Sequence, residues 1–348
     1  MARRHTRLLP SDTAGIAEAA AILRAGGLVA FPTETVYGLG AHALNAHAVR
    51  GIFEAKSRPA DDPLIVHLAD PSDLEAVAFP VAATARLADR FWPGPLTLVL
   101  EKREVVPGEV TAGLKTVAVR VPSHPVAGAL LRAAALPIAA PSANLFGRPS
   151  PTRATHVLED LDGRIDAVLD GGPTPVGVES TIVDLVSNPP RLLRPGGLAA
   201  EEIEAVLNLR LASVSGTQKG PRVAPGLMTV HYSPRTPLTV IVGGVVGARE
   251  RLVCELRASV ASGQRIGVLA LAEDVPLLPP HLRVEVVGSS DDPPELAAHL
   301  FQAMRVLDAE NLDGLYARTL ADPSVGLGRA LADRLRRAAF RVIDAGAD

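Results

Sequence analysis

Pro32-Thr-Glu-Thr-Val-Tyr-Gly-Leu-Gly40 is the stretch on which the fold prediction rests, because it begins where the apolar run Leu28–Phe31 ends. A short apolar run between turn residues predicts a buried strand, and α/β proteins place ligand groups at the ends of such strands. Thr33 and Thr35 can expose hydroxyl groups there, and the two glycines permit close backbone approach to a ligand. A turn without any ligand is the alternative interpretation.

A second segment, Lys56-Ser-Arg-Pro-Ala-Asp-Asp-Pro-Leu-Ile-Val-His67, places two cations at the end of an expected helix. Arg58 offers a planar fork of N–H donors and Lys56 a point charge, a combination suited to a polyphosphate. Cations that merely complement the negative end of a helix are the alternative. Asp62 complicates the pattern, because its carboxylate could cap a turn, hold a divalent metal or repel a phosphate.

A third segment, Pro141-Ser-Ala-Asn-Leu-Phe-Gly-Arg-Pro-Ser-Pro-Thr152, follows an apolar strand expected at residues 137–140. The hydroxyl, amide and backbone N–H groups around Ser142 and Asn144 can cradle an anion. Arg120 closes another expected strand, and a buried guanidinium at that position requires a carboxylate or phosphate partner. Each signal is weak by itself, but together they predict a site for a nucleotide and an amino acid.

Alternating strand and helix patterns along the chain predict an α/β layer structure. The periodicity fades between about residues 208 and 237, where several prolines and His231-Tyr-Ser-Pro234 predict a semi-rigid linker. A second α/β pattern follows the linker. We therefore expect a first domain over residues 1–207, a linker over 208–237 and a smaller open-sheet domain over 238–348.

The composition of the 348 residues, with 47% hydrophobic and 21% charged side chains, is typical of a globular protein. A net charge of −3 argues against a strongly electrostatic nucleic-acid binder. Because Cys254 is the single cysteine, an internal disulfide and any multi-cysteine metal site are excluded. We expect Cys254 on a helix of the second domain, with its side chain in the hydrophobic core. The longest apolar stretch, residues 126–140, is interrupted by Arg132 and Pro137 and is shorter than the roughly 20 residues that span a bilayer. We expect no membrane association and a cytoplasmic location.

The motifs of two common enzyme classes are absent from this sequence. The sequence contains no Gly-x-x-x-x-Gly-Lys-Ser/Thr loop of P-loop enzymes and no Gly-x-Ser-x-Gly elbow of serine hydrolases. Three other classes stay open. They are a protein that binds double-stranded RNA or tRNA, a regulator that senses ATP or threonine without catalysis, and a carbamoyltransferase that uses carbamoyl phosphate.

Taken in order, the three segments together with Glu179-Ser-Thr-Ile-Val-Asp184 resemble the YrdC/Sua5 family of threonylcarbamoyl-AMP synthases. The His-Tyr-Ser-Pro linker and the tail from Gly326 to Ala339 resemble the longer, two-domain Sua5 form, so that the resemblance covers almost the whole chain. It implies a YrdC-like twisted open sheet with a large concave cavity and a smaller Rossmann-like α/β domain at the C-terminus.

The resemblance also implies a role for individual positions. The residues it assigns to L-threonine are Thr35, His67, Arg120, Ser142 and Ser180. The residues it assigns to ATP are Lys56, Arg58, Asp62, Thr116, Ser142, Asn144, Thr152 and Arg194. We expect Lys56 and Arg58 to weigh most in catalysis, because negative charge develops on the departing pyrophosphate.

The implied reaction joins L-threonine, bicarbonate and ATP into L-threonylcarbamoyladenylate and pyrophosphate. Mg²⁺ would arrive with the nucleotide, without a metal site that the protein itself supplies. The product would pass to the downstream transferase machinery that makes t6A at position 37 of tRNA, so that contact with tRNA would be indirect or weak.

Two positions depart from the family pattern, and one segment suggests a moving part. Many relatives carry Asn where this chain has Asp62, which puts direct contact with ATP in doubt, and Phe146 replaces a small hydroxyl residue. We expect the linker with Tyr232 to fold over the cleft of the first domain as a lid that excludes water.

Overall fold

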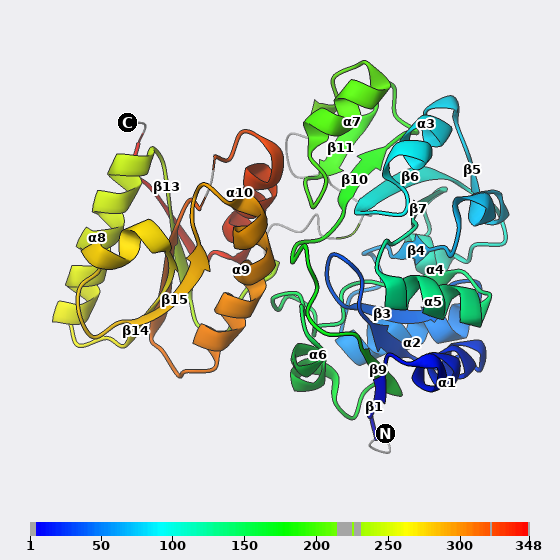
Figure 1. Cartoon of the computed structure of the whole chain (residues 1–348), viewed down its shortest axis with the longest axis horizontal. Helices are drawn as coiled ribbons and strands as arrows, with labels where there is room; N and C mark the ends of the chain where they lie inside the picture. The colour runs from blue at the N-terminus through cyan, green and yellow to red at the C-terminus, as the bar shows by residue number, and fades with distance from the viewer. Residues whose placement is uncertain (1–4, 214–224, 226–230, 321, 347–348) are drawn as a thin grey trace. The chain divides into compact units, whose positions relative to one another are not determined.

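The computed structural model describes residues 5–213, 225, 231–320 and 322–346, and the chain divides into two compact units. The first unit comprises Met1–Phe146 and Ser150–Leu227, and the second comprises Gly147–Pro149 and Met228–Asp348. The division after residue 227 falls within the stretch 208–237 that we expected to be a linker. Figure 1 shows that each unit combines a sheet with packed helices.

The first unit contains, within its described residues, a 12-stranded mixed sheet. In chain order its strands are β1 (Arg7–Pro10), β2 (Val29–Phe31), β3 (Gly38–His42), β4 (Ile65–His67), β5 (Ala78–Phe79), β6 (Leu96–Lys102), β7 (Thr116–Arg120), β8 (Ile138–Ala139), β9 (Ala167–Asp170), β10 (Thr181–Asp184), β11 (Arg191–Arg194) and β12 (Ala212–Ser213). Their spatial order is β1-β9-β2-β3-β8-β4-β7-β6-β10-β11-β12, and β5 pairs with β6. This sheet confirms the expected open α/β architecture.

Helices cover this sheet, and some of them begin at a side-chain cap. They are α1 (Thr13–Arg24), α2 (Ala46–Lys56), α3 (Ala82–Phe91), α4 (Gly108–Thr111), α5 (Pro125–Ala134), α6 (Ala154–Leu161), α7 (Ala200–Leu207) and the 3₁₀ helix η1 (Pro71–Ala76). The Asp12 side chain accepts a hydrogen bond from the backbone N–H of Gly15 at the start of α1. Asn45 caps α2 in the same way, as its side chain predicts.

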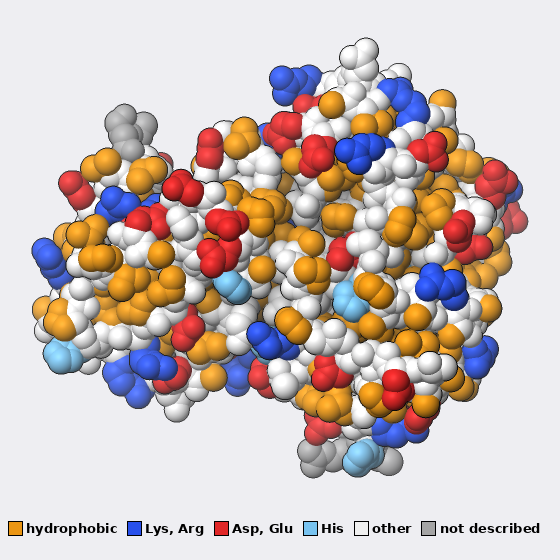
Figure 2. Space-filling model, viewed as in Figure 1, with side chains coloured by type: hydrophobic (Ala, Val, Ile, Leu, Met, Phe, Trp, Pro, Cys, Tyr) orange, Lys and Arg blue, Asp and Glu red, His pale blue; other side chains and the backbone are white. Residues whose placement is uncertain are grey.

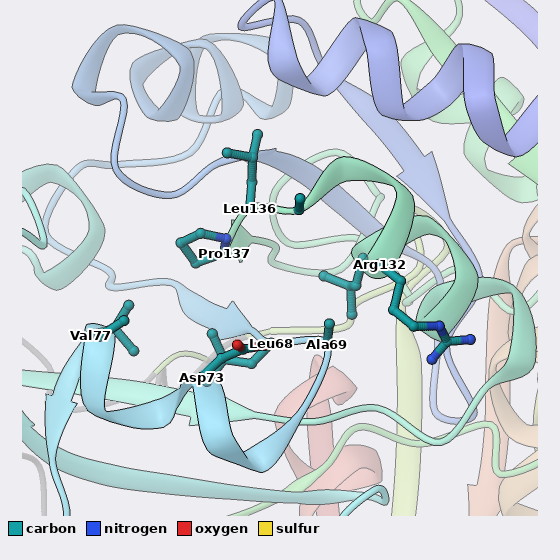
Figure 3. Close-up of a pocket in the computed structure, with 10 residues that line it drawn as sticks. Leu68, Ala69, Asp73, Val77, Arg132, Leu136 and Pro137 are labelled. Atoms are coloured by element: carbon teal, nitrogen blue, oxygen red, sulfur yellow. The ribbon is translucent and has the colours of Figure 1, made fainter.

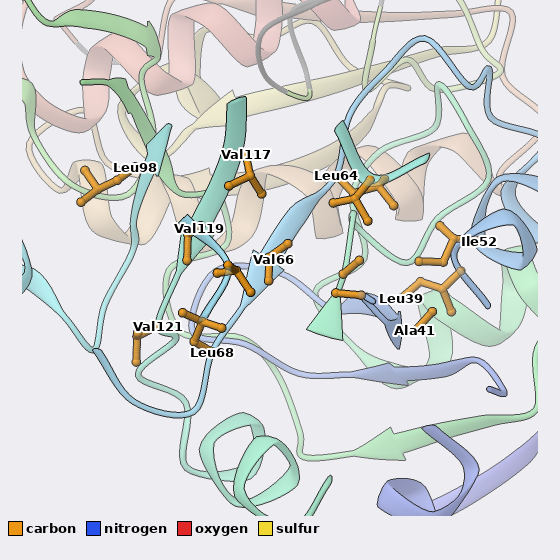
Figure 4. Packing of buried hydrophobic residues seen from close by; sticks show 14 of the residues in the cluster. Leu39, Ala41, Ile52, Leu64, Val66, Leu68, Leu98, Val117, Val119 and Val121 are labelled. Carbon is orange, nitrogen blue, oxygen red and sulfur yellow. The ribbon is translucent and has the colours of Figure 1, made fainter. Parts of the chain in front are cut away.

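The core of the first unit lies on both faces of the sheet. Alternate residues of β2 and its approach belong to different clusters, with Val29 and Phe31 in one and Leu28 and Ala30 in the other. Figure 4 shows part of the larger cluster, where labelled aliphatic side chains from β3, β4, β6 and β7 gather. Burial on both faces explains why these strands read as continuous apolar runs.

The sequence pattern does not predict strand β3, which pairs antiparallel with β2 and β8. A Cβ atom on Gly40 would lie 2.9 Å from side-chain atoms of both Ile138 and Phe31, so glycine at this position permits the sheet to pack. Packing is thus sufficient reason for glycine here, and the expected approach of a ligand to Gly40 stays a prediction. Tyr37, from the same segment, is fully buried in the core.

The second unit contains a five-stranded sheet in which every pairing is parallel. Its elements are β13 (Leu238–Val242), α8 (Val245–Ala261), β14 (Ile266–Leu271), η2 (Ala272–Leu277), β15 (Arg283–Gly288), α9 (Pro293–Asp308), β16 (Gly314–Arg318), α10 (Gly326–Ala338) and β17 (Arg341–Asp344). The open parallel sheet agrees with a Rossmann-like domain. Its order, β15-β14-β16-β13-β17, places β16 between β13 and β14, whereas dinucleotide-binding sheets keep their first three strands adjacent.

Two remaining observations concern single features. Cys254 lies on α8 with its side chain exposed, so the expectation that it belongs to the core is wrong. None of the helices in the described residues is long and apolar enough to cross a membrane.

Candidate functional site

The first and third segments lie side by side in the sheet. Gly38 forms an isolated bridge with Ser142, and the backbone N–H of Leu39 donates to Pro141 O at 2.8 Å. The backbone N–H of Tyr37 also donates to the carbonyl of Pro151 at 2.8 Å, at the far end of the third segment. These backbone contacts bring two polar loops together that are about 100 residues apart in the chain.

The second segment joins the third through Lys56. Lys56 is the last residue of α2, and Ser57 ends the helix in the left-handed conformation with φ of 52°. The side chain is 1% exposed, and its ammonium group donates to Ser142 O at 2.6 Å and to the carbonyl of Asn144. The Phe146 N–H donates in turn to Lys56 O at 3.0 Å. Lys56 therefore places a buried positive charge directly on the Ser142–Phe146 loop.

Arg58 turns back onto its own segment. Its Nη2 lies 2.9 Å from the Asp62 carboxylate and donates to Pro63 O at 2.9 Å, and both charged side chains are buried. The carboxylate that was expected to contact the nucleotide thus pairs with the guanidinium expected to bind its phosphates. Such a buried ion pair holds the Arg58 side chain in one rotamer and partly cancels the positive charge of its guanidinium.

This pairing predicts an unusual result for Asp62→Asn. The amide keeps an acceptor for Arg58 but removes the negative charge, so we expect affinity for ATP to rise about 3- to 10-fold. Stability without nucleotide should fall by about 1–3 kcal/mol, because the buried guanidinium loses its counter-charge. Calorimetric titration with ATP, and melting with and without ATP, measure the two effects. Weaker binding of ATP would instead mean that Asp62 contacts the nucleotide, directly or through Mg²⁺ or water.

Two of the residues expected to bind threonine, Thr35 and His67, lie beside Arg120 at the end of β7. Its guanidinium donates to Thr35 Oγ1 at 3.0 Å and to Gly94 O at 3.2 Å. Its Nη2 lies 2.7 Å from Oε1 of Glu34, a residue that the motif reasoning did not single out. Arg120 is only 3% exposed, and the Glu34 carboxylate is the partner that this burial requires.

His67 ends β4 in register with Arg120 on the neighbouring parallel strand β7. Burial, together with the positive charge of Arg120, lowers the pKa of His67 to about 3. The imidazole is therefore neutral at pH 7, and its Nδ1 lies 3.2 Å from Ile65 O. Because Ile65 O can only accept, Nδ1 carries the proton of the neutral ring, and Nε2 is then an acceptor that suits a hydroxyl or ammonium group of a ligand.

A second cluster forms where β10 meets β11. Arg194 donates to Ser180 O at 2.9 Å and to Ser180 Oγ at 3.2 Å, and its Nη1 donates to Pro225 O at 3.3 Å. Ser180 Oγ is also 2.7 Å from Thr97 Oγ1. The structure thus joins one residue expected at threonine to one expected at ATP, and adds Thr97, which sequence reasoning missed.

Two further residues expected at ATP have different surroundings. Thr152 is 3% exposed, and its backbone N–H lies 3.2 Å from His156 Nδ1. Thr116 begins β7 opposite Glu101, at the other end of that strand from Arg120.

Ser150 Oγ donates to Glu179 Oε1 at 2.5 Å, which ties the third segment to the loop before Ser180. Motif matching did not reveal this link, because a serine paired with a distant glutamate leaves no local pattern.

Tyr232, the residue expected in the lid, is described within the second unit. Its ring is 1% exposed, lies 5.5 Å from the ring of Phe301 and faces the Arg334 guanidinium at 5.2 Å. Most of the expected linker, residues 214–224 and 226–230, lies outside the described residues. The lid therefore stays a prediction.

A separate cavity of about 390 Å³ lies in the first unit (Figure 3). Its lining is mainly apolar, and η1 and the end of α5 supply much of its wall. The lining residues are Leu68, Ala69, Asp73, Ala76, Val77, Leu131, Arg132, Ala135, Leu136 and Pro137. None of them belongs to the residues that the sequence assigned to ATP or threonine.

Comparison with known families identifies this arrangement. The Sua5/YciO/YrdC family model, described under the heading of telomere recombination, matches residues 21–196. The chain belongs to this family. A second model, described as the C-terminal domain of threonylcarbamoyl-AMP synthase, matches residues 198–340, which gives the two-domain Sua5 organisation.

Individual family members are similar over nearly their whole length. Threonylcarbamoyl-AMP synthase of Bacillus subtilis is 46% identical over 334 residues, which cover 95% of this chain and 94% of the relative. The enzyme of the same name from Pyrococcus abyssi is 46% identical and covers 93% of this chain and 94% of its own. The crystal structure of P. abyssi Sua5 complexed with L-threonine has a TM-score of 0.90 at 43% identity, covering 97% and 99% of the two chains.

Proposed function

We propose that this member of the Sua5 family is a threonylcarbamoyl-AMP synthase, an enzyme that forms L-threonylcarbamoyladenylate from L-threonine, bicarbonate and ATP. The observation that carries the proposal is the buried Arg120, hydrogen-bonded to Thr35 and in register with neutral His67. Arg120 and Thr35 supply donors that suit a carboxylate, in a chain whose 46% identical relatives bear this enzyme name, and both facts support the proposal. That a related Sua5 structure contains L-threonine supports the same substrate.

In the proposed reaction, the threonine amine and bicarbonate give a carbamate and water. A carbamate oxygen then attacks the α-phosphorus of ATP, and the bond to pyrophosphate breaks. Because a carbamate is short-lived in water, the protein must hold it beside ATP, and effective molarities of ~10⁵ M or more are available to well-oriented groups. Arg120 and Thr35 would hold the amino acid by its carboxylate, with His67 beside them as an acceptor for a hydroxyl or ammonium group.

The nucleotide would lie against the Ser142–Phe146 loop. The charge of Lys56, fixed on the Ser142 and Asn144 carbonyls, would stabilise the negative charge that moves to pyrophosphate. Arg194, already bonded to Ser180, would connect the two substrates. No covalent intermediate with the enzyme is needed, because positioning and electrostatics can carry this chemistry.

Mg²⁺ remains part of the proposal as an ion that accompanies ATP. Within the described residues, no group of three or more His, Cys, Asp or Glu side chains could hold a metal by itself. We propose that phosphate oxygens and water would hold Mg²⁺, while Asp62 stays paired with Arg58. When bound, the ion would neutralise charge on the phosphates.

The lid can be tested at Tyr232. Tyr232→Ala would remove a ring that packs against Phe301, at a cost of about 3–5 kcal/mol in stability, so its effect on activity is ambiguous. Tyr232→Phe keeps the ring and removes only the hydroxyl. If the linker closes the site through this hydroxyl, Tyr232→Phe should weaken threonine affinity several-fold and shorten the lifetime of the product. Unchanged values in both variants would contradict the lid.

Binding of double-stranded RNA or tRNA is the second candidate function. On the face shown in Figure 2, Lys and Arg side chains are interspersed with Asp and Glu, and the net charge is −3. Neither observation favours a strong phosphate-backbone footprint. We propose that contact with tRNA is indirect or weak, that the product passes to the transferase machinery for t6A, and that the reaction takes place in the cytoplasm.

Pyrophosphate release from ATP and Mg²⁺, with L-threonine and bicarbonate added or omitted in turn, tests the proposed function. Release that requires both substrates supports the synthase. Release that requires threonine alone would indicate an ordinary amino-acid-adenylating enzyme. Binding of ATP without release would favour a sensor, and salt-dependent RNA binding without turnover would favour the RNA-binding alternative.

A further inference from the structure

Glu34 is a buried carboxylate at the threonine site that the proposed function does not use. It lies in the loop between β2 and β3, is 5% exposed, and its Oε1 is 2.7 Å from Arg120 Nη2. The loop is well held, because Val176 N–H donates to Glu34 O at 2.9 Å and Gly177 N–H donates to Thr35 O at 3.1 Å. The carboxylate therefore has a fixed place beside the guanidinium.

Both members of this ion pair keep hydrogen-bonding capacity. In the described part of the chain, neither carboxylate oxygen of Glu34 has a partner with normal hydrogen-bond geometry, and the same holds for Arg120 Nη2. The other guanidinium nitrogens donate to Gly94 O and Thr35 Oγ1. Glu34 Oε1 and Arg120 Nη2 already pair with each other, but a carboxylate accepts more than one hydrogen bond and each guanidinium nitrogen of this kind carries two N–H groups, so the remaining capacity suits a ligand that carries both a donor and an acceptor.

Both groups are also charged. Burial is the largest single influence on the pKa of Glu34 and raises it, but the positive charge of Arg120 and the hydrogen-bond donors around the carboxylate together outweigh burial, so the pKa lies below its usual value. The backbone N–H groups of Glu34 and Ser123 act in the same direction, without completing a hydrogen bond of normal geometry. Glu34 is therefore a carboxylate at neutral pH, next to a guanidinium.

The charge balance selects among possible ligands. A zwitterion leaves the buried site electrically neutral, because its ammonium faces the carboxylate and its carboxylate faces the guanidinium. A carboxylic acid without an amine would add a negative charge beside Glu34 with only one cation to share, and burial makes such an excess costly. Groups 2.7 Å apart suit the ammonium and carboxylate of an α-amino acid, which are attached to one carbon atom.

We propose that Glu34 binds the α-ammonium group of the amino-acid substrate while Arg120 binds its carboxylate. Glu34 is then a specificity-determining residue, which admits zwitterionic amino acids and rejects carboxylates that lack the amine. It also holds in place the nitrogen that, after the ammonium has released a proton, combines with bicarbonate to give the carbamate and water. This role rests on the proposed function and adds a contact to the amino-acid side of the same site.

Calorimetry on the full-length protein can test this role with two ligands. L-Threonine and (R)-3-hydroxybutyrate share the carboxylate, the β-hydroxyl and the methyl group, and differ only in the amine. The unaltered protein should prefer threonine strongly. In Glu34→Gln this preference should shrink by about 10- to 100-fold, because the charged acceptor for the ammonium is lost. Glu34→Asp, which keeps the charge on a shorter arm, should retain part of the preference.

Asp184→Asn is the matched control. Asp184 is a buried carboxylate whose side chain accepts from the backbone N–H groups of Val186 and Ser187, in a turn after β10. This variant should leave the preference for threonine unchanged. Binding of ATP and the melting temperature show whether each variant is folded.

The possible outcomes separate two failures. If Glu34→Gln leaves the preference for threonine unchanged, the inference is wrong. When the affinities for both ligands fall by the same factor, Glu34 only supports Arg120, and when neither affinity changes, Glu34 does not contribute to binding. If the unaltered protein binds no L-threonine at all, with or without ATP, the proposed function itself fails.

Discussion

Replacing Lys56 with methionine should lower threonine- and bicarbonate-dependent pyrophosphate release by about 10²- to 10³-fold, the usual cost of removing one group that stabilises transition-state charge. Methionine fills a similar volume but carries no charge. It also leaves the Ser142 and Asn144 carbonyls without their ammonium donor, in a place where Lys56 is 1% exposed. The loop expected to hold ATP would lose both its charge and its anchor.

Lys102 provides a matched control for this experiment. It also donates its ammonium group to a backbone carbonyl, Val106 O at 2.7 Å, but it ends β6 outside the three segments. Lys102→Met should therefore change stability slightly and leave pyrophosphate release intact. Equal losses in the two variants would assign the effect to general destabilisation, and normal release in Lys56→Met would remove Lys56 from the catalytic residues.

The second large effect is expected at Arg120. Arg120→Lys keeps a positive charge but loses the planar fork that reaches Thr35, Gly94 and Glu34 at once. We expect kcat/KM for L-threonine to fall by about 10²-fold, since charged hydrogen bonds contribute about 1.5–3 kcal/mol each. The Kd for ATP should stay the same. Steady-state kinetics with each substrate varied in turn separates the two effects.

A pair of further variants separates binding from folding at this position. Arg120→Met leaves the Glu34 carboxylate buried without its counter-charge, which should cost about 3–5 kcal/mol of stability. Adding Glu34→Gln to Arg120→Met should restore most of that stability, because both charges are then gone. Activity should stay lost in the double variant. Recovery of threonine turnover there would show that Arg120 does not bind the substrate.

Much of the fold follows from local patterns in the sequence. The caps Asp12 and Asn45, the apolar periodicity of the helices and the short buried strands predict elements that the structure contains. The pattern does not predict β3, because Gly38-Leu-Gly40 has few strand-forming residues and gains its place only by pairing with β2 and β8. Helix α6 and strand β11 are missed in the same way, as short elements stabilised by their neighbours.

The site shows a similar division. The residue types at the loops, and their likeness to the YrdC/Sua5 pattern, were enough to indicate an amino acid and a nucleotide. They did not indicate Glu34 or Thr97, and they suggested that Arg58 and Asp62 both face the nucleotide. The structure pairs Arg58 with Asp62 instead. A buried charge without a partner is costly, and each of these two side chains offsets the charge of the other.

The sequence by itself determined the class of fold, the two-domain plan and the family, because these depend on short-range periodicity and on motifs that stay together in the chain. Only the tertiary structure decided which polar and charged groups meet. Arg120 reaches Thr35 across 85 positions and Lys56 reaches Ser142 across 86. Such pairings depend on strand order and register, and many strand orders are compatible with the same local patterns.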